Sequence, residues 1–288
     1  MNAIVSPRLG ILALLAIATT FGSNHIAARI AFDHGTSVTA AVAIRSGFTA
    51  LFLLGLMRFS GVSLALPRST LYRALAIGLL IALQSFCLYS AVALIPVALA
   101  LLAFNTFPIV LALLSWATGG GRPRGAALAA MPLALVGLSL ALDVFGKPVK
   151  PAGVAWALGA SLTFALALLL TTRWLKDVDG RLRTFLTMSV TAVVVLVAGL
   201  ASDAFTFPQA PAGWVGLALL TVLYGAAITS LFIVLPHLGP ANYAVVLNFE
   251  PIAVLFLAWP ILGQAVAPLQ IVGAFLVVGA IMLTALRR

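Results

Sequence analysis

Two charged residues, Arg45 and Glu250, stand inside long apolar stretches of the sequence. A charge at the centre of a bilayer costs about 2.5–3.5 kcal/mol on insertion scales, so such residues usually pair or face water. Their similar expected depth makes the two residues candidate partners. They could hold a zwitterionic solute or a proton. The alternatives are a fixed structural ion pair, or an Arg45 side chain that extends to the membrane surface.

Phe21, Asn24 and His25 follow one another at the spacing i, i+3 and i+4, which places them on one face of a helix. An aromatic ring beside two polar groups suits an amphipathic solute in a largely apolar pocket, and histidine can titrate near neutral pH. Hydrogen bonding between helices is the alternative for a buried histidine. Other residues in apolar stretches could bind a solute or simply pack, namely Gln84, Tyr89, Phe164 and Tyr224.

An asparagine precedes a proline by three residues at two places, Asn105 with Pro108 and Asn248 with Pro251. A proline inside a helix lacks an N–H and displaces the carbonyl four residues earlier. In a membrane that carbonyl needs a partner or a wet cavity, and the nearby asparagine could supply an amide donor. We therefore predict two kinked helices that bound a substrate site and hinge at the prolines. The alternative is that the kinks only set helix packing.

The composition places these residues in a membrane protein. The chain has 288 residues, of which 63% are hydrophobic and 8% charged, whereas soluble domains have about 25% charged residues. The long apolar runs match helices, which need about 20 residues to cross a bilayer, and not the short alternating strands of a barrel. We predict an all-α integral membrane protein with ten transmembrane helices, at residues 9–31, 36–57, 70–94, 97–118, 125–143, 152–174, 184–202, 213–236, 241–262 and 268–286.

The positive charge of the chain predicts its orientation in the membrane. With the N-terminus inside, twelve of the sixteen Lys and Arg residues fall on the inner side and three on the outer side. Basic residues gather in cytoplasmic loops, so both termini are expected in the cytoplasm of a bacterial inner membrane. The net charge of +10 is thereby explained without a nucleic-acid partner.

The sequence also matches itself weakly at a shift of 143 residues. The two Asn-x-x-Pro-Ile motifs coincide, and each is followed at the same distance by a tryptophan, Trp116 and Trp259. Five spans per half is an odd number, so the second half is expected upside down relative to the first. We predict two inverted five-helix repeats, residues 1–145 and 146–288. Secondary transporters use this architecture and hold substrate near mid-membrane between the repeats.

Enzyme signatures are not found in the sequence. It contains no phosphate-binding Walker loop, no HExxH zinc motif and no Cys pair, since Cys87 is the single cysteine. We therefore expect no catalytic residues, no metal and no cofactor.

The residues Phe21-Gly22-Ser23-Asn24, Glu250-Pro251, Gly273 and Gly279, on ten spans in two halves, resemble the EamA-type family of the drug/metabolite transporter superfamily. Members export amino acids and other small metabolites, and the chain is most similar to the YddG-type exporters of aromatic and other apolar amino acids. Many members have Trp where this chain has Phe21. The small four-helix relatives use a first-span glutamate that this chain lacks.

The resemblance and the residues together predict a secondary exporter of neutral apolar or aromatic amino acids, working by alternating access as a monomer or homodimer. The lipid bilayer and a small-molecule substrate are the expected partners. The alternatives are transport of drug-like cations or nucleotide sugars, or a membrane enzyme or scaffold.

Overall fold

The computed structural model describes residues 7–119, 132–133, 136–137, 139–140, 149–234, 250–263 and 267–286. Helices occupy nine of the ten predicted spans, and the fifth span, 125–143, lies mostly outside the described residues. The helices are α1 (Pro7–Asp33), α2 (Val38–Phe59), α3 (Arg68–Leu94), α4 (Val97–Phe104), α5 (Phe107–Ala117), α7 (Pro151–Trp174), α8 (Gly180–Ala201), α9 (Pro211–Val234), α11 (Glu250–Leu262) and α12 (Pro268–Leu286).

The distribution of polar and apolar side chains is that of a protein in lipid. Large apolar side chains such as Leu51, Phe59 and Leu200 are 71%, 94% and 68% exposed, whereas Asn24 and Arg45 are buried. Soluble proteins rarely bury arginine or leave so much large apolar surface uncovered. By length and composition, six candidate spans are found among the described residues, at α2, α3, α4 with α5, α7, α8 and α9. The chain is therefore a multi-pass membrane protein.

Local sequence signals set where several helices begin. Ser37 caps α2, because its hydroxyl accepts a hydrogen bond from the Ala40 backbone N–H at 3.2 Å. Asp179 caps α8 in the same way, accepting from the Arg181 N–H at 2.8 Å. The Arg181 side chain also donates to this carboxylate and lowers the pKa of Asp179 below its ordinary value.

The fourth predicted span is broken and not simply kinked. α4 ends at Phe104 and α5 begins at Phe107, so Pro108 lies in the first turn of α5, where a missing N–H costs little. The Asn105 amide was expected to serve the carbonyl of Phe104. It donates instead to the carbonyl of Leu101 at 2.8 Å, one turn back in its own helix. In the equivalent span the described helix α11 begins at Glu250; Asn248 and the side chain of Pro251 lie outside the described part.

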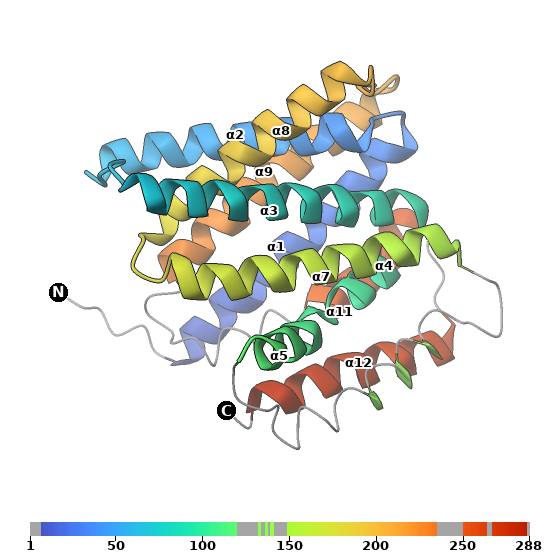
Figure 1. Ribbon diagram of the computed structural model, residues 1–288. Coiled ribbons are helices and arrows are strands. Elements are labelled where there is room, and N and C mark those ends of the chain that lie inside the picture. The colour runs from blue at the N-terminus through green and yellow to red at the C-terminus, as the bar shows by residue number, and fades with distance from the viewer. Residues whose placement is uncertain are drawn as a thin grey trace.

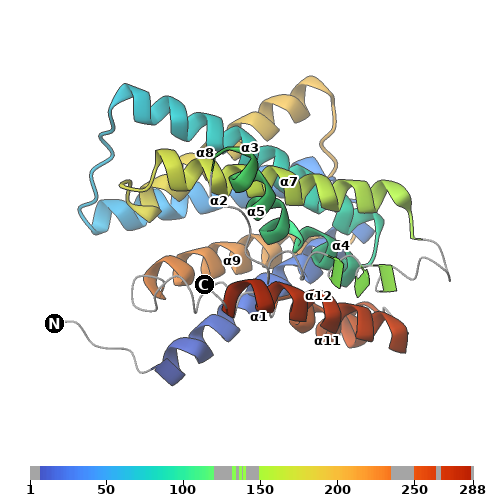
Figure 2. The same ribbon diagram turned by 60° about the horizontal axis from the view of Figure 1, so that its bottom comes forward.

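The packing of the helices repeats itself when the two halves are exchanged. At the shift of 143 residues α1, α2 and α3 correspond to α7, α8 and α9, and α4 with α5 corresponds to α11. Under this correspondence the contact between α1 and α9 is equivalent to the contact between α7 and α3. The contact between α1 and α11 is equivalent to the contacts of α7 with α4 and α5. The contact between α2 and α8 is equivalent to itself. All these contacts are present, so the halves interleave (Figures 1 and 2). α1 and α7 run in opposite directions in Figure 1, which is consistent with inverted repeats.

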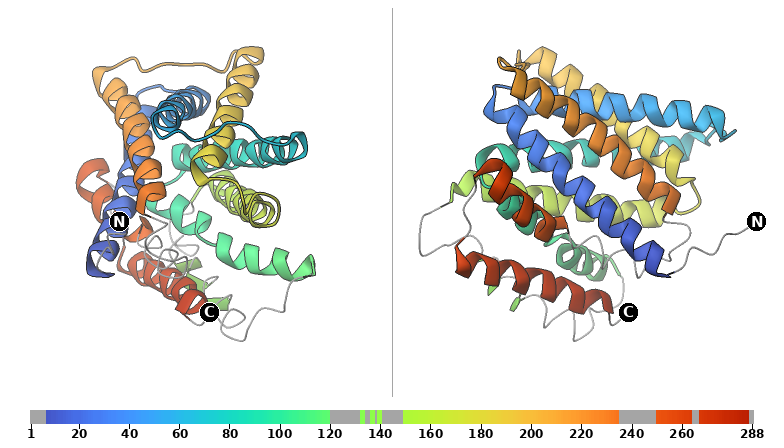
Figure 3. Two further views of the ribbon diagram at one scale, coloured as in Figure 1. Left: turned by 90° about the vertical axis from the view of Figure 1, so that its left-hand side faces the viewer. Right: turned by 180° about the vertical axis from the view of Figure 1, so that it is seen from behind.

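α1 and α9 lie side by side (Figure 3, right) and approach closely at Gly216 of α9. A Cβ atom at Gly216 would lie 2.8 Å from the backbone nitrogen of Ala31 and 2.9 Å from the carbonyl oxygen of Ala27. Backbone atoms cannot swing away as a side-chain tip can. Only glycine therefore fits this contact.

We predict that Gly216→Ala lowers the apparent melting temperature of the detergent-solubilised protein by several degrees, because overpacking costs about 1–3 kcal/mol. Gly55→Ala is the matched control. Gly55 also lies inside a helix, but a Cβ there would meet nothing within 4 Å. Alanine should be neutral or stabilising at that position. Equal melting temperatures for the two variants would contradict the close approach.

Candidate functional site

Asn24 ties together three helices in the middle of the bundle. It is fully buried on α1, its amide N–H donates to the Leu220 carbonyl of α9, and its Oδ1 accepts the Tyr89 hydroxyl of α3 at 2.7 Å. Both functional ends of the amide are therefore used within the protein. This side chain holds α1, α3 and α9 in register around the residues described next.

His25, on the next position of α1, contacts the one acid on α11. His25 Nε2 lies 3.3 Å from Glu250 Oε1, and the two side chains are 8% and 16% exposed. The Nδ1 atom of His25 is buried and has no hydrogen-bond partner among the described residues. Arg45, the candidate partner of Glu250, is therefore not its partner in this structure. Glu250 pairs with His25 because α11 packs directly on α1.

Arg45 of α2 is 2% exposed, which rules out a side chain extended to the membrane surface. Its guanidinium carbon lies 3.7 Å from the Tyr224 ring centroid and 4.9 Å from that of Tyr89. Nη2 donates to Ser85 Oγ at 3.1 Å, while Nε has no partner in the described part of the chain.

The energy balance of Arg45 is unusual. Burying an ion costs several kcal/mol even after the protein relaxes. A desolvated contact with an aromatic ring returns about 2 kcal/mol, and a hydrogen bond to a charged group about 1.5–3 kcal/mol. No carboxylate of the described residues lies within 4.0 Å of Arg45. The two rings and Ser85 thus compensate a charge that has no counter-ion among the described residues.

The predicted binding residues of α1, α3, α9 and α11 come together around Arg45 in one connected group. The rings of Tyr224 and Phe21 meet edge to face, with their centroids 5.9 Å apart, and the Tyr224 hydroxyl donates to Met188 Sδ at 3.7 Å. Ser85 Oγ donates to Gln84 Oε1 at 3.5 Å. The His25 ring lies 5.5 Å from that of Tyr89. We call this group the central cluster: Phe21, Asn24, His25, Arg45, Gln84, Ser85, Tyr89, Tyr224 and Glu250.

Two other predicted residues lie in a different place, where α7 meets α4 and α5. The Phe164 ring stands 4.9 Å from Phe107 and 5.4 Å from Phe104. Nearby, the hydroxyls of Thr106 and Ser161 are 3.0 Å apart, and Asn105 is buried with its amide engaged by its own helix. Sequence reasoning did not single out Thr106, Ser161 or Met188. Hydroxyls and thioethers in apolar helices carry no spacing signal that could have marked them.

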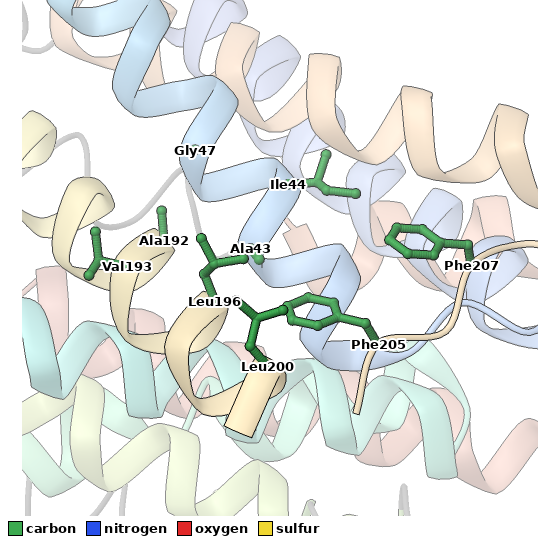
Figure 4. Close-up of a pocket in the computed structure, with 9 residues that line it drawn as sticks. All are labelled: Ala43, Ile44, Gly47, Ala192, Val193, Leu196, Leu200, Phe205 and Phe207. Atoms are coloured by element: carbon green, nitrogen blue, oxygen red, sulfur yellow. The ribbon is translucent and has the colours of Figure 1, made fainter. Parts of the chain in front are cut away.

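The groove in Figure 4 is not the polar site. It measures about 440 Å³ and lies between α2 and α8, under the segment that follows α8. Its lining is entirely apolar: Ala43, Ile44, Gly47, Ala192, Val193, Leu196, Leu200, Phe205 and Phe207. A binding site needs a few placed polar groups to orient its ligand, and this groove has none. Val193 and Leu200 are 59% and 68% exposed, so the groove opens where lipid chains would lie.

The described residues contain no group of three or more His, Cys, Asp or Glu side chains placed to hold a metal. What the central cluster offers is one cation, one acid paired with a histidine, amide groups and three aromatic rings, supplied by helices of both halves. These groups are of the kinds that orient an amphipathic molecule in a binding site.

These features define a multi-pass membrane protein with two interleaved halves and a polar site between them. The chain belongs to the EamA-like transporter family, whose model matches residues 8–142 and 151–286, one match in each half. It is therefore a transporter and not an enzyme. No curated protein matches the sequence significantly. One solved structure, described only as the crystal structure of a protein, aligns over 97% of this chain and 99% of its own, with a TM-score of 0.71. At 17% identity that likeness supports the fold alone.

We predict that Tyr89→Phe lowers the apparent melting temperature by a few degrees. The substitution leaves the buried Oδ1 of Asn24 without its donor, which costs about 1–3 kcal/mol. Tyr72→Phe removes the same hydroxyl from a 70% exposed position on the same helix and should change nothing. The link between α1 and α3 would be refuted if the two variants unfolded alike.

Proposed function

We propose that the protein is a secondary exporter of neutral, largely apolar amino acids, working by alternating access around the central cluster. The observation that carries the proposal is the presence of two opposite charges in the central cluster, each on a different half: Arg45, buried against two tyrosine rings, and Glu250, which is 16% exposed. A zwitterion presents one group of each sign and would match both. The remaining rings suit its side chain.

The charge inventory of the cluster argues against the other solute classes. A phosphorylated or nucleotide substrate calls for a cluster of Lys or Arg, and Arg45 is the only one in the central cluster. A lipophilic dication would call for two acids, and the cluster contains Glu250 alone. An apolar amino acid needs neither, and Phe21, Tyr89 and Tyr224 provide an aromatic wall for its side chain.

The arrangement of the helices supports alternating access as the mechanism. Residues of the cluster come from α1, α2 and α3 of the first half and from α9 and α11 of the second. A relative movement of the halves would therefore change access to the cluster from either side. The break before Pro108, and Pro251 at the equivalent position of the second half, are the proposed hinges.

The substrate assignment is tested with proteoliposomes loaded with radiolabelled leucine or phenylalanine. We expect efflux that other apolar amino acids inhibit and that sugar phosphates, nucleotide sugars and lipophilic dications do not. Competition by phosphorylated sugars, without competition by apolar amino acids, would refute the assignment. A chemically altered solute would favour an enzyme.

A variant of the acid tests the site itself. Glu250→Gln should raise the KM for a zwitterionic substrate by about 10- to 100-fold, because a charged hydrogen bond is lost. Asp203→Asn makes the same change at an exposed residue outside the cluster and should transport normally. Unchanged transport by Glu250→Gln would remove the acid from the site.

We further propose that the protein lies in a bacterial inner membrane with both termini in the cytoplasm, as a monomer or homodimer. The basis is the twelve-to-three distribution of basic residues. Reporter enzymes fused to either terminus should be active only if they work in the cytoplasm, whereas a reporter that works only in the periplasm should be active when it is inserted in the loop at residues 144–151. Periplasmic activity at a terminus would reverse the orientation.

A further inference from the structure

We propose that Arg45 is the subsite for a carboxylate, so that the transporter selects solutes that carry one. This inference rests on the proposed function and assigns one end of the substrate to one side chain. Its starting point is the guanidinium that is buried with an unpartnered Nε and without a counter-ion among the described residues.

The acids among the described residues leave Arg45 free for an external anion. Asp33 pairs with Arg29, Asp179 with Arg181 and Glu250 with His25. Asp177 and Asp203 lie in the connections between helices, and Asp143 lies outside the described part. Within the described helices, Glu250 is thus paired with His25 and not with Arg45.

The contacts of the guanidinium leave a donor for a carboxylate. Tyr224 and Tyr89 contact Arg45 through their rings, at 3.7 and 4.9 Å from the ring centroids to the guanidinium carbon. Nη2 donates to Ser85 Oγ, and the buried Nε has no hydrogen-bond partner in the described part. A carboxylate bound beside the guanidinium would accept from Nε, and the planar guanidinium is suited to binding a carboxylate through two N–H groups at once.

The position of Arg45 also suits a substrate whose other end is an ammonium group. The Tyr89 ring contacts both the Arg45 guanidinium and the His25 ring. His25 in turn pairs with Glu250. A zwitterion could therefore reach from the guanidinium to the acid past a single ring. Because Arg45 is buried in this state, the carboxylate must arrive when α9, which carries Tyr224, has moved away from α2.

The alternative is that Arg45 has only a structural role and stabilises the packing of α2, α3 and α9.

Three ligands that share the phenylalanine side chain distinguish these explanations. They are phenylalanine, phenylalaninamide, which lacks the carboxylate, and 3-phenylpropionate, which lacks the amine. Binding to the full-length protein in detergent is measured by ligand-induced shifts in melting temperature, which report affinity together with folding. The variants are Arg45→Gln and Arg45→Lys. Arg29→Gln serves as the control, because Arg29 holds Asp33 and the end of α3 outside the cluster.

We expect Arg45→Gln to weaken binding of phenylalanine and of 3-phenylpropionate by about 10- to 100-fold and to leave phenylalaninamide within about threefold. Arg45→Lys keeps the charge but loses the planar set of N–H donors of the guanidinium. Its affinity for a carboxylate should therefore fall between those of the wild type and Arg45→Gln. If Arg45→Gln does not fold, Arg45→Lys must still show the carboxylate-selective loss. Arg29→Gln can lower the melting temperature but should keep the wild-type selectivity.

The subsite would be overturned if the Arg45 variants lost affinity equally for all three ligands, or lost none. It would also be overturned if the wild type bound neither phenylalanine nor 3-phenylpropionate. Failure of the proposed function looks different. If the wild type binds 3-phenylpropionate through Arg45 but no amino acid crosses the membrane, the subsite stands and amino-acid export is refuted.

Discussion

Polar groups inside this bundle must find their partners within the protein, because hydrocarbon offers none. Most do so locally: the hydroxyls of Thr19, Thr163 and Thr221 each donate to a carbonyl one turn earlier in their own helix. Five buried side-chain atoms of the described residues remain without a partner, and two of them, His25 Nδ1 and Arg45 Nε, belong to the central cluster. Two of the five unsatisfied atoms thus belong to the charged residue Arg45 and to the histidine paired with Glu250, where a solute could supply a hydrogen-bond partner.

The architecture is nearly symmetric, yet the polarity of the site is not. The residues found 143 positions away from Arg45, His25 and Glu250 are Met188, Leu168 and Phe107. The junction of α1 with α11 is therefore charged, whereas its counterpart, where α7 meets α5, contains the edge-to-face rings of Phe107 and Phe164. The two halves thus share a common arrangement of helices, and differences at a few positions make one junction polar and the other apolar.

The sequence was sufficient for the helices because each apolar run is long enough to cross a bilayer, and for the α1 face because helical periodicity places Phe21, Asn24 and His25 together. Depth along the membrane can be estimated from a sequence, but lateral position cannot. Arg45 was therefore a candidate partner of Glu250, although the packing of α11 on α1 pairs Glu250 with His25. For the same reason the sequence could not show that Phe164, unlike Phe21, lies at the apolar junction and outside the central cluster.

This asymmetry bears on how a cycle of the proposed kind would work. In an inverted repeat the inward-open and outward-open states are related by exchanging the conformations of the halves. If both copies of the site were charged, a zwitterion could bind in two opposite orientations. The central cluster, as far as its residues are described, contains one guanidinium on α2 and one carboxylate on α11, so under the proposed function the charges would favour a single orientation of the solute. The solute would then remain bound in place while the halves, joined through the contacts of Tyr224 with Arg45 and of Glu250 with His25, part first on one side and then on the other.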